Sequence, residues 1–194
     1  DLDDYFKQDS NKVQSNKDLE FIYKFELKEK YTITFEGRLF DLSGNHQKLD
    51  DISNMEKKKE YDREAEIGSI LDTYPSKANY VFMGWYKDRE MSKLLLKNDK
   101  VVKDEVVYAK FIRSSHFGTE DSSDVQLRNL GGGGYAIEHI NKLDLFGANY
   151  GHLYIPKEIN GTSVKEFGVY ATNARPFDNN IFYPIRNYNI THIY

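Results

Sequence analysis

Short segments that alternate apolar and polar side chains constrain this chain more than any other feature. The clearest is YTITFE at residues 31–36, where Ile33 and Phe35 alternate with threonine and glutamate. A period of two places successive side chains on opposite faces of a β-strand. The segments YVFMGWY at 80–86 and EVVYAKF at 105–111 favour two further strands. The sequence therefore predicts a strand-rich α+β fold.

One short helix is expected between the first of these strands and the other two. Ile67, Ile70 and Leu71 have the spacing of an apolar helix face, and a proline shortly afterwards ends the pattern. The carboxylates of EYDREAE at 60–66 alternate with basic side chains, which is typical of a solvated helix face. Residues 30–112 are thus expected to form a small α+β sheet.

The single tryptophan lies within the second predicted strand. Simple alternation places Trp85 on one face with Val81 and Met83, and Phe82 on the opposite face. A ligand platform would require exposure, so we interpret Trp85 as a core residue. Gly84 indicates a place where a neighbouring side chain crosses the backbone, because a glycine inside a strand leaves room for one.

The chain contains an internal echo in its first half. KDLEFIYKF at residues 17–25 aligns without a gap on KDEVVYAKF at residues 103–111. Repeated segments of this kind indicate a repeated structural unit. Residues 1–29 are therefore expected to be the tail of an earlier unit, and residues 30–112 to form a complete one.

A change of composition suggests a boundary after residue 112. Residues 113–132 are polar and glycine-rich, and we interpret them as a linker in which the GGGG run at 131–134 is a flexible joint. Residues 133–194 contain short apolar segments separated by turn signals such as Asn160–Gly161.

A second echo lies in this C-terminal part. GHLY at residues 151–154 resembles THIY at residues 191–194, which is typical of stacked repeats. Stacked repeats gain most of their stability from neighbours, so this part should be marginal alone or should dock on the N-terminal unit.

Residues 30–112 resemble the Listeria-Bacteroides repeat, the β-grasp-like module of internalin-type surface proteins. The family has a GWY strand followed by a closing strand that ends in YA and an aromatic residue. The positions that carry the resemblance are Tyr80, Phe82, Gly84, Trp85, Tyr86, Val107, Tyr108, Ala109 and Phe111.

Residues 133–194 resemble the start of a leucine-rich repeat domain of the BspA type. The positions that carry this second resemblance are Tyr135, Ile137, Leu153, Ile155, Pro156, Ile159, Asn160, Gly161, Val164, Phe167, Gly168 and Ala171. Together the two resemblances imply an extracellular bacterial protein, secreted or held at the cell surface. They assign these residues a structural role, not a catalytic one.

Charge and composition narrow the possible partners. The formal net charge of -4 and the pI of about 5.8 argue against nucleic acid, which requires a basic surface. The chain has no cysteine and no apolar run long enough to span a bilayer, so we expect no disulfide and no membrane insertion in this segment. Because the chain begins at Asp1 and not at a methionine, we interpret it as a piece of a longer polypeptide.

No pattern in the sequence predicts a catalytic, cofactor or metal site. The GGGG run lacks the lysine and hydroxyl residue of a phosphate loop. Asp41, Ser43 and Asn45 resemble the opening of a calcium loop, but His46 stands where glycine is required, which favours a polar turn. The histidines are scattered, and the serines lack the context of a nucleophile elbow.

The function that these resemblances imply is non-catalytic. We expect a β-grasp spacer followed by a leucine-rich repeat domain that presents an adhesive face to a host or bacterial surface protein or to a glycan. Two alternatives remain open. One is that the chain is an accessory region of a larger secreted hydrolase. The other is that it is a carbohydrate-binding module that uses exposed tyrosines.

Overall fold

The computed structural model describes residues 29–118, 124–147, 151–167 and 192–194. Within these ranges the chain is strand-rich, with two five-stranded sheets, a two-stranded sheet and one short α-helix. The predicted tail of an earlier unit, apart from its last residue, lies outside the described residues, as does Gly168.

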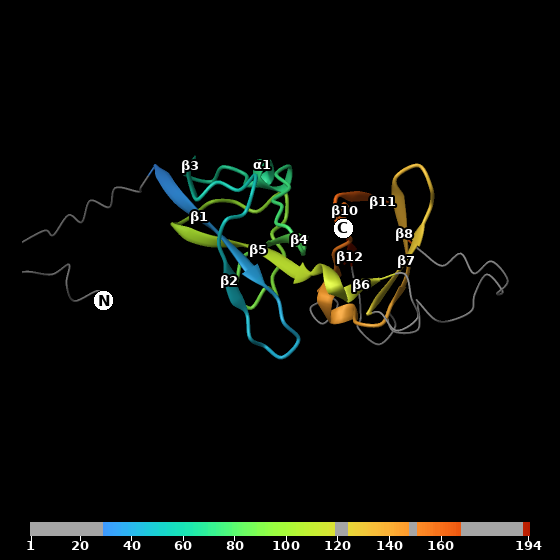
Figure 1. Cartoon of the computed structure of the whole chain (residues 1–194). Helices are drawn as coiled ribbons and strands as arrows, with labels where there is room; N and C mark the ends of the chain where they lie inside the picture. The colour runs from blue at the N-terminus through green and yellow to red at the C-terminus, as the bar shows by residue number, and fades with distance from the viewer. Residues whose placement is uncertain (1–28, 119–123, 148–150, 168–191) are drawn as a thin grey trace, which may run out of the picture.

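The first sheet is built around its longest strand. β1 (Lys30–Leu39) pairs in parallel with β5 (Glu105–Arg113), which pairs antiparallel with β4 (Tyr80–Tyr86). The other edge of β1 is shared by two antiparallel strands, β2 (Gln47–Leu49) and β3 (Lys58–Asp62). Figure 1 shows these two short strands at opposite ends of β1. All three strands expected from alternation are confirmed.

The helix is shorter than the sheet face that it covers. α1 spans Gly68–Leu71, a single turn, and buries Ile70. The charged segment before it is not a helix face, as its alternating charges had suggested. Its first part belongs to β3, where Tyr61 is buried between exposed charged neighbours. A strand with one solvated face also carries polar residues at alternate positions. The charge pattern alone therefore does not distinguish a strand from a solvated helix.

A β-bulge in β4 changes which side chains share a face. Phe82 pairs with Phe111 and Trp85 with Ala109, so β4 has one more residue than β5 between these pairs. Gly84 lies at the bulge with φ of +98°, a conformation that glycine adopts without strain. The extra residue puts Trp85 on the face of Phe82, so the prediction that it joins Val81 and Met83 is wrong.

The second sheet has the order β10-β11-β8-β7-β6. β8 (Gly134–Ile140) pairs antiparallel with β7 (Val125–Asn129) on one side and in parallel with β11 (Thr162–Phe167) on the other. The outer strands are β6 (Phe117–Gly118), parallel to β7, and β10 (Glu158–Ile159), antiparallel to β11.

The predicted linker differs from what the structure contains at these residues. β5 continues to Arg113, a 3-10 turn follows at η2 (Ser114–His116), and β6 and β7 lie within the same stretch. The glycine run is the turn of the β7–β8 hairpin, closed by a hydrogen bond from Leu130 N–H to the Gly134 carbonyl. Three successive glycines there have positive φ, which explains the composition without a flexible joint.

The C-terminal echo corresponds to paired strands. β9 (His152–Leu153) follows η3 (Leu143–Phe146) and pairs in parallel with β12 (His192–Ile193). His152 is the register partner of His192, and the two rings stack with centroids 5.6 Å apart. The Asn160–Gly161 turn joins β10 to β11, as expected, with φ of 51° and 75°.

Two hydrophobic clusters form the core of the described residues. The first core lies on the inner face of the first sheet and contains, among others, Ile33, Phe35, Phe82, Trp85, Val107 and Phe111. The second core combines residues of the second sheet with the outer face of β4, including Val81, Met83, Tyr86, Ile137, Phe146 and Leu153. Trp85 is 3% exposed and donates from Nε1 to the Thr73 carbonyl at 3.3 Å.

Trp85 provides a direct test of the first core. We expect blue-shifted emission that iodide quenches poorly, because only 3% of the Trp85 surface is exposed. Trp85→Ala should reduce the free energy of unfolding by about 3–5 kcal/mol, the usual cost of emptying a large aromatic site. The measurements are steady-state quenching and urea unfolding, and a red emission that iodide quenches fully would contradict the assignment.

Candidate functional site

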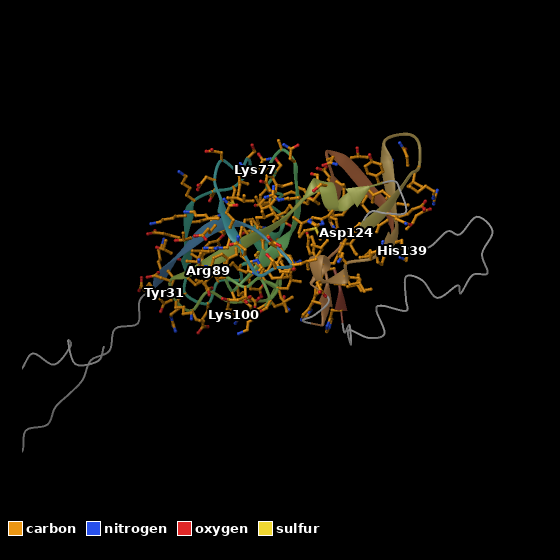
Figure 2. All side chains as sticks on the ribbon, turned by 60° about the horizontal axis from the view of Figure 1, so that its bottom comes forward. Tyr31, Lys77, Arg89, Lys100, Asp124 and His139 are labelled. Carbon is orange, nitrogen blue, oxygen red and sulfur yellow. The ribbon has the colours of Figure 1, made fainter. Side chains whose placement is uncertain are left out.

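The two sheets meet through side chains that belong to one cluster. Val81 and Met83 of β4 and Ile112 of β5 pack in the second core with residues from beyond the predicted boundary, and all three are at most 2% exposed. Figure 2 shows side chains filling the region between the two sheets. The joint between the two parts is therefore a packed apolar interface, and β4 is buried on both faces.

The Tyr154 ring lies directly over Gly84 at this interface. A Cβ atom at this position would lie 2.9 Å from Cδ2 of Tyr154, which belongs to the C-terminal part. The Tyr154 ring also lies edge-on to Phe82, with centroids 6.2 Å apart. Burial raises the pKa of Tyr154. The expectation that a side chain crosses the backbone at Gly84 is confirmed, and that side chain comes from the other part of the chain.

A tyrosine hydroxyl links the two parts through the backbone. Tyr74 donates to the Glu158 carbonyl at 3.2 Å and accepts from the Glu158 N–H at 3.1 Å. Burial raises the pKa of Tyr74 to about 12. Glu158 lies in β10 at the end of the second sheet, so one phenol satisfies both backbone groups of an edge strand.

A buried lysine lies at the same interface. Lys110 is fully buried in β5, with Nζ 3.9 Å from the centroid of the Phe40 ring and 5.3 Å from that of Tyr86. Neither its Nζ nor Oδ1 of Asp144 has a hydrogen-bond partner among the described residues. Burial lowers the pKa of Lys110 to about 7, and the charge of Asp144 opposes this shift only in part.

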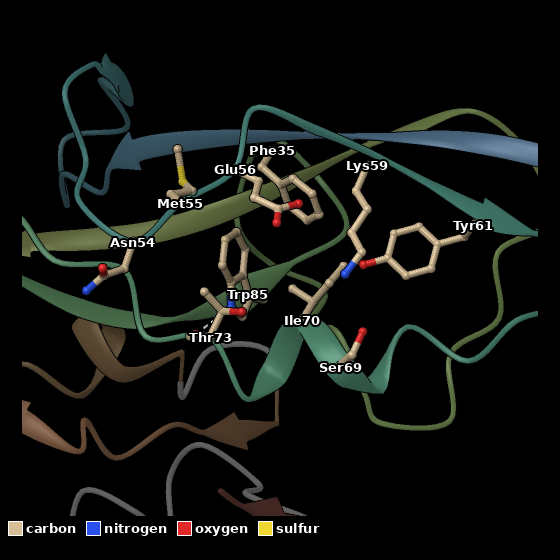
Figure 3. A pocket seen from close by; sticks show the side chains of 10 residues that line it. All are labelled: Phe35, Asn54, Met55, Glu56, Lys59, Tyr61, Ser69, Ile70, Thr73 and Trp85. Carbon is tan, nitrogen blue, oxygen red and sulfur yellow. Dashed lines mark hydrogen bonds between the residues drawn. The ribbon is translucent and has the colours of Figure 1, made fainter.

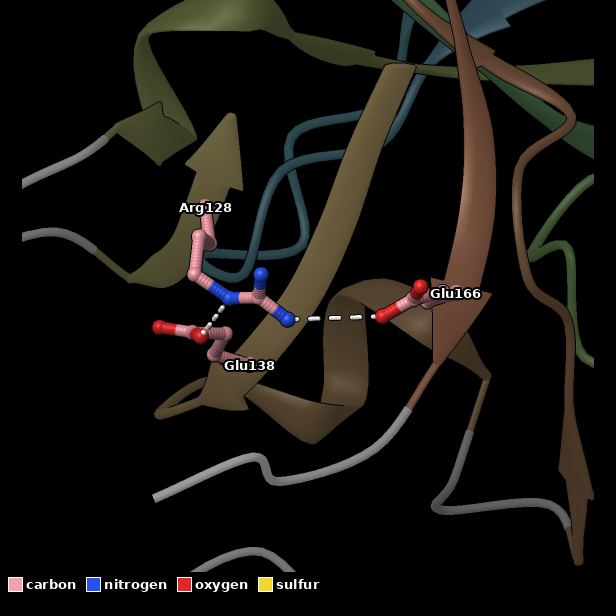
Figure 4. A network of polar contacts seen from close by, with 3 residues as sticks. All are labelled: Arg128, Glu138 and Glu166. Carbon is pink, nitrogen blue, oxygen red and sulfur yellow. Dashed lines mark hydrogen bonds and ion pairs between the residues drawn. The ribbon is translucent and has the colours of Figure 1, made fainter. Parts of the chain in front are cut away.

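The outer face of the second sheet is polar. Arg128 in β7 contacts Glu138 in β8 through Nε and Glu166 in β11 through Nη2, the latter at 3.3 Å (Figure 4). All three side chains remain between 28% and 42% exposed. Charged groups from three neighbouring strands therefore form one solvent-accessible row.

The structure places the predicted motif residues in two locations. Phe82, Trp85 and Phe111 belong to the first core and Tyr80 packs against it, whereas Tyr86 belongs to the second core. Tyr108, Ile155 and Val164 pack against the second core. Pro156 is buried, and Gly161 lies in the turn between β10 and β11. Gly168 lies outside the described residues, so its predicted role stays a prediction.

The sequence did not reveal the polar members of the interface. Tyr74 lies in an irregular loop, and Lys110 carries a charge in a segment where charge normally indicates solvent exposure. The only available signal was the position of Lys110 between Ala109 and Phe111 within an apolar strand. The predicted polar turn is present, with Ser43 N–H donating to Asp41 Oδ1 at 2.9 Å.

Outside the interface, the part of the chain that the structure describes has few arrangements typical of a metal, membrane or catalytic site. Those residues contain no group of three or more side chains able to hold a metal ion. No helix among them has the length and apolar character needed to cross a membrane. One His–Asp pair occurs, between His116 Nδ1 and Asp124 Oδ2 at 2.6 Å, and both side chains are 30% exposed.

In comparisons with known proteins, no family model, no curated protein and no solved structure matches the chain.

The Gly84 contact yields a matched pair of substitutions. Gly44 has φ of +82° with open space around it, whereas Gly84 has φ of +98° beneath the Tyr154 ring. Gly44→Ala should therefore cost only the strain of a positive φ, about 1–2 kcal/mol. Gly84→Ala should lower the free energy of unfolding, measured in urea, by clearly more than this. When Gly84→Ala is combined with Tyr154→Ala, the additional loss should disappear. Equal losses for the two glycine variants would mean that the Tyr154 contact contributes nothing.

Lys110 predicts an unusual dependence of stability on pH. The unfolded chain keeps this lysine protonated up to its ordinary pKa of 10.5, while the folded state releases the proton near pH 7. The unfolded state binds more protons between these values, so the free energy of unfolding should rise as pH increases from about 7 to 9.

Lys110→Met should raise stability at neutral pH and flatten this rise, because an apolar side chain of similar length needs no buried charge. The exposed Lys100→Met is the control and should leave the slope unchanged. The measurement is the urea midpoint at several pH values below the range in which tyrosines lose their protons. An unchanged dependence of stability on pH in Lys110→Met would contradict the assignment of this dependence to Lys110.

Proposed function

We propose that this chain is a non-catalytic unit of an extracellular bacterial protein, in which a β-grasp-like module braces the start of a leucine-rich repeat domain of the BspA type. The observation that carries the proposal is the second core, which joins the outer face of β4 to the second sheet. A shared core holds two modules in a fixed orientation, as a spacer that presents a binding surface requires.

The topology supports both halves of the proposal. In the first sheet the first and last long strands, β1 and β5, pair in parallel beside a short helix, which is compatible with a grasp-like module. In the second part β8 pairs in parallel with β11, and β9 with β12, which is compatible with stacked repeats. The antiparallel β7 then covers the opposite edge of β8 and ends the stack on that side.

The proposed presenting surface is the polar outer face of the second sheet. Arg128, Glu138 and Glu166 lie on three adjacent strands, so their spacing is fixed by the hydrogen-bonded ladder. Half-exposed arginine and carboxylate groups on a rigid sheet suit a polar protein or glycan partner. An accessory role within a larger secreted hydrolase remains the alternative, and it uses the same rigid joint.

Adhesion of coated beads tests the proposal. Beads that carry the chain should be retained on mucin, fibronectin, collagen or cultured epithelial cells more strongly than beads that carry albumin. Arg128→Gln should reduce retention severalfold, because the two carboxylates lose their shared partner. Lys100→Gln, on the first sheet's side of the molecule, is the matched control and should not change retention.

Two results would overturn the proposal. Retention equal to that of albumin on every surface would remove the adhesive role. Turnover of chromogenic glycosides, esters or casein by the purified chain would show that the unit is itself catalytic.

A further inference from the structure

A cavity opens onto the first core beside the short helix. It has a volume of about 430 Å³ and lies between the arm that carries Asn54 to Tyr61 and the turn of α1. Figure 3 shows Phe35 and Trp85 at its floor, with Ser69, Ile70 and Thr73 on the helix side. Because α1 has only one turn, it covers this part of the inner sheet face incompletely, and Phe35 and Trp85 keep exposed fractions of 8% and 3%.

One wall of the cavity carries a buried polar group without a partner. Tyr61 is 9% exposed, and its hydroxyl makes no hydrogen bond within the described residues. In Figure 3 this hydroxyl points toward the centre of the cavity, beside the amine of Lys59. A buried hydroxyl without a partner is costly, and a ligand hydroxyl would satisfy it once the Lys59 side chain beside it moves aside.

The lining combines two kinds of surface. Phe35 and Trp85 on the floor and Ile70 on the helix side form the apolar part of the lining. The rim carries side chains that form hydrogen bonds, some charged and some neutral. They are Asn54, Glu56, Lys59, Ser69 and Thr73. The negative charge of Glu56 and the positive charge of Lys59 offset each other, so the lining favours a neutral ligand.

We propose that this cavity binds one pyranose ring of a glycan. A pyranose has a C–H face that suits an aromatic floor and several hydroxyl groups that donate and accept, which matches the rim and the Tyr61 hydroxyl. An apolar peptide side chain would fill the floor but would leave Tyr61 and the rim without partners. The site lies on the first sheet, away from the proposed presenting face, and does not depend on that proposal.

Trp85 is the only tryptophan of the chain and lines this cavity, so it reports on occupancy directly. The probes are the methyl glycosides of glucose, mannose, galactose and N-acetylglucosamine, added to the full chain up to about 0.1 M because contact with one sugar gives millimolar affinity. At least one should shift the indole N–H resonance and the emission of Trp85 saturably.

Tyr61→Phe removes only the unpartnered hydroxyl. It should weaken binding of that glycoside about three- to tenfold, the value of one neutral hydrogen bond, while stability stays the same or rises. Tyr80→Phe, which lies outside this cavity, is the matched control and should bind as the unaltered chain does. Ser69→Ala changes an exposed rim group and should weaken binding to a smaller extent, and it serves if Tyr61→Phe does not fold.

Three outcomes would overturn the proposal. The first is that no glycoside perturbs Trp85. The second is that Tyr61→Phe, or Ser69→Ala in its place, binds as tightly as the unaltered chain, which would put the sugar elsewhere. The third is that benzyl alcohol saturates the site while every glycoside fails, which would make the cavity purely apolar.

Discussion

The structure depends on the burial of both faces of β4. Its side chains Val81, Phe82, Met83, Trp85 and Tyr86 are all at most 4% exposed, although the strand forms the edge of its sheet. An antiparallel sheet commonly keeps one solvated face, and burial of both faces requires a second layer. The bulge at Gly84 divides the five side chains between two cores. β4 therefore contributes to the cores of both parts, and the polar segment 113–132 does not separate them.

This sharing compensates for the small size of each part. A domain of about 80 residues is close to the size at which a single hydrophobic core gives only marginal stability. By placing Val81 and Met83 in the second core, the first sheet supplies apolar area that the short strands of the second sheet lack. The Tyr74 phenol then satisfies both backbone groups of Glu158 at the rim of the contact. Buried apolar surface and satisfied backbone hydrogen-bonding groups thus both stabilise the same interface.

Sequence reasoning succeeded where a local pattern has one structural solution. Alternation identified β1, the in-strand Gly84 indicated a crossing side chain, and Asn160–Gly161 indicated a turn. It failed where two structures share a pattern. Charged β3 resembles a helix surface, and the GGGG run suits a hinge as well as a hairpin turn. The bulge shifts alternation by one residue, and only the pairing with β5 reveals it.

The two faces of the first sheet are closed to different degrees, and this follows from what covers them. The outer face of β4 meets a whole sheet, so its interface is filled, even to the point of enclosing Lys110 against the Phe40 ring. The aliphatic stem of that lysine packs as an apolar residue would, which offsets part of the cost of its buried amine. The inner face meets a helix of one turn, which cannot span the sheet and leaves Tyr61 without a partner. The cavity that opens into the first core therefore lies on the incompletely covered inner face. The outer face of β4 joins the two parts.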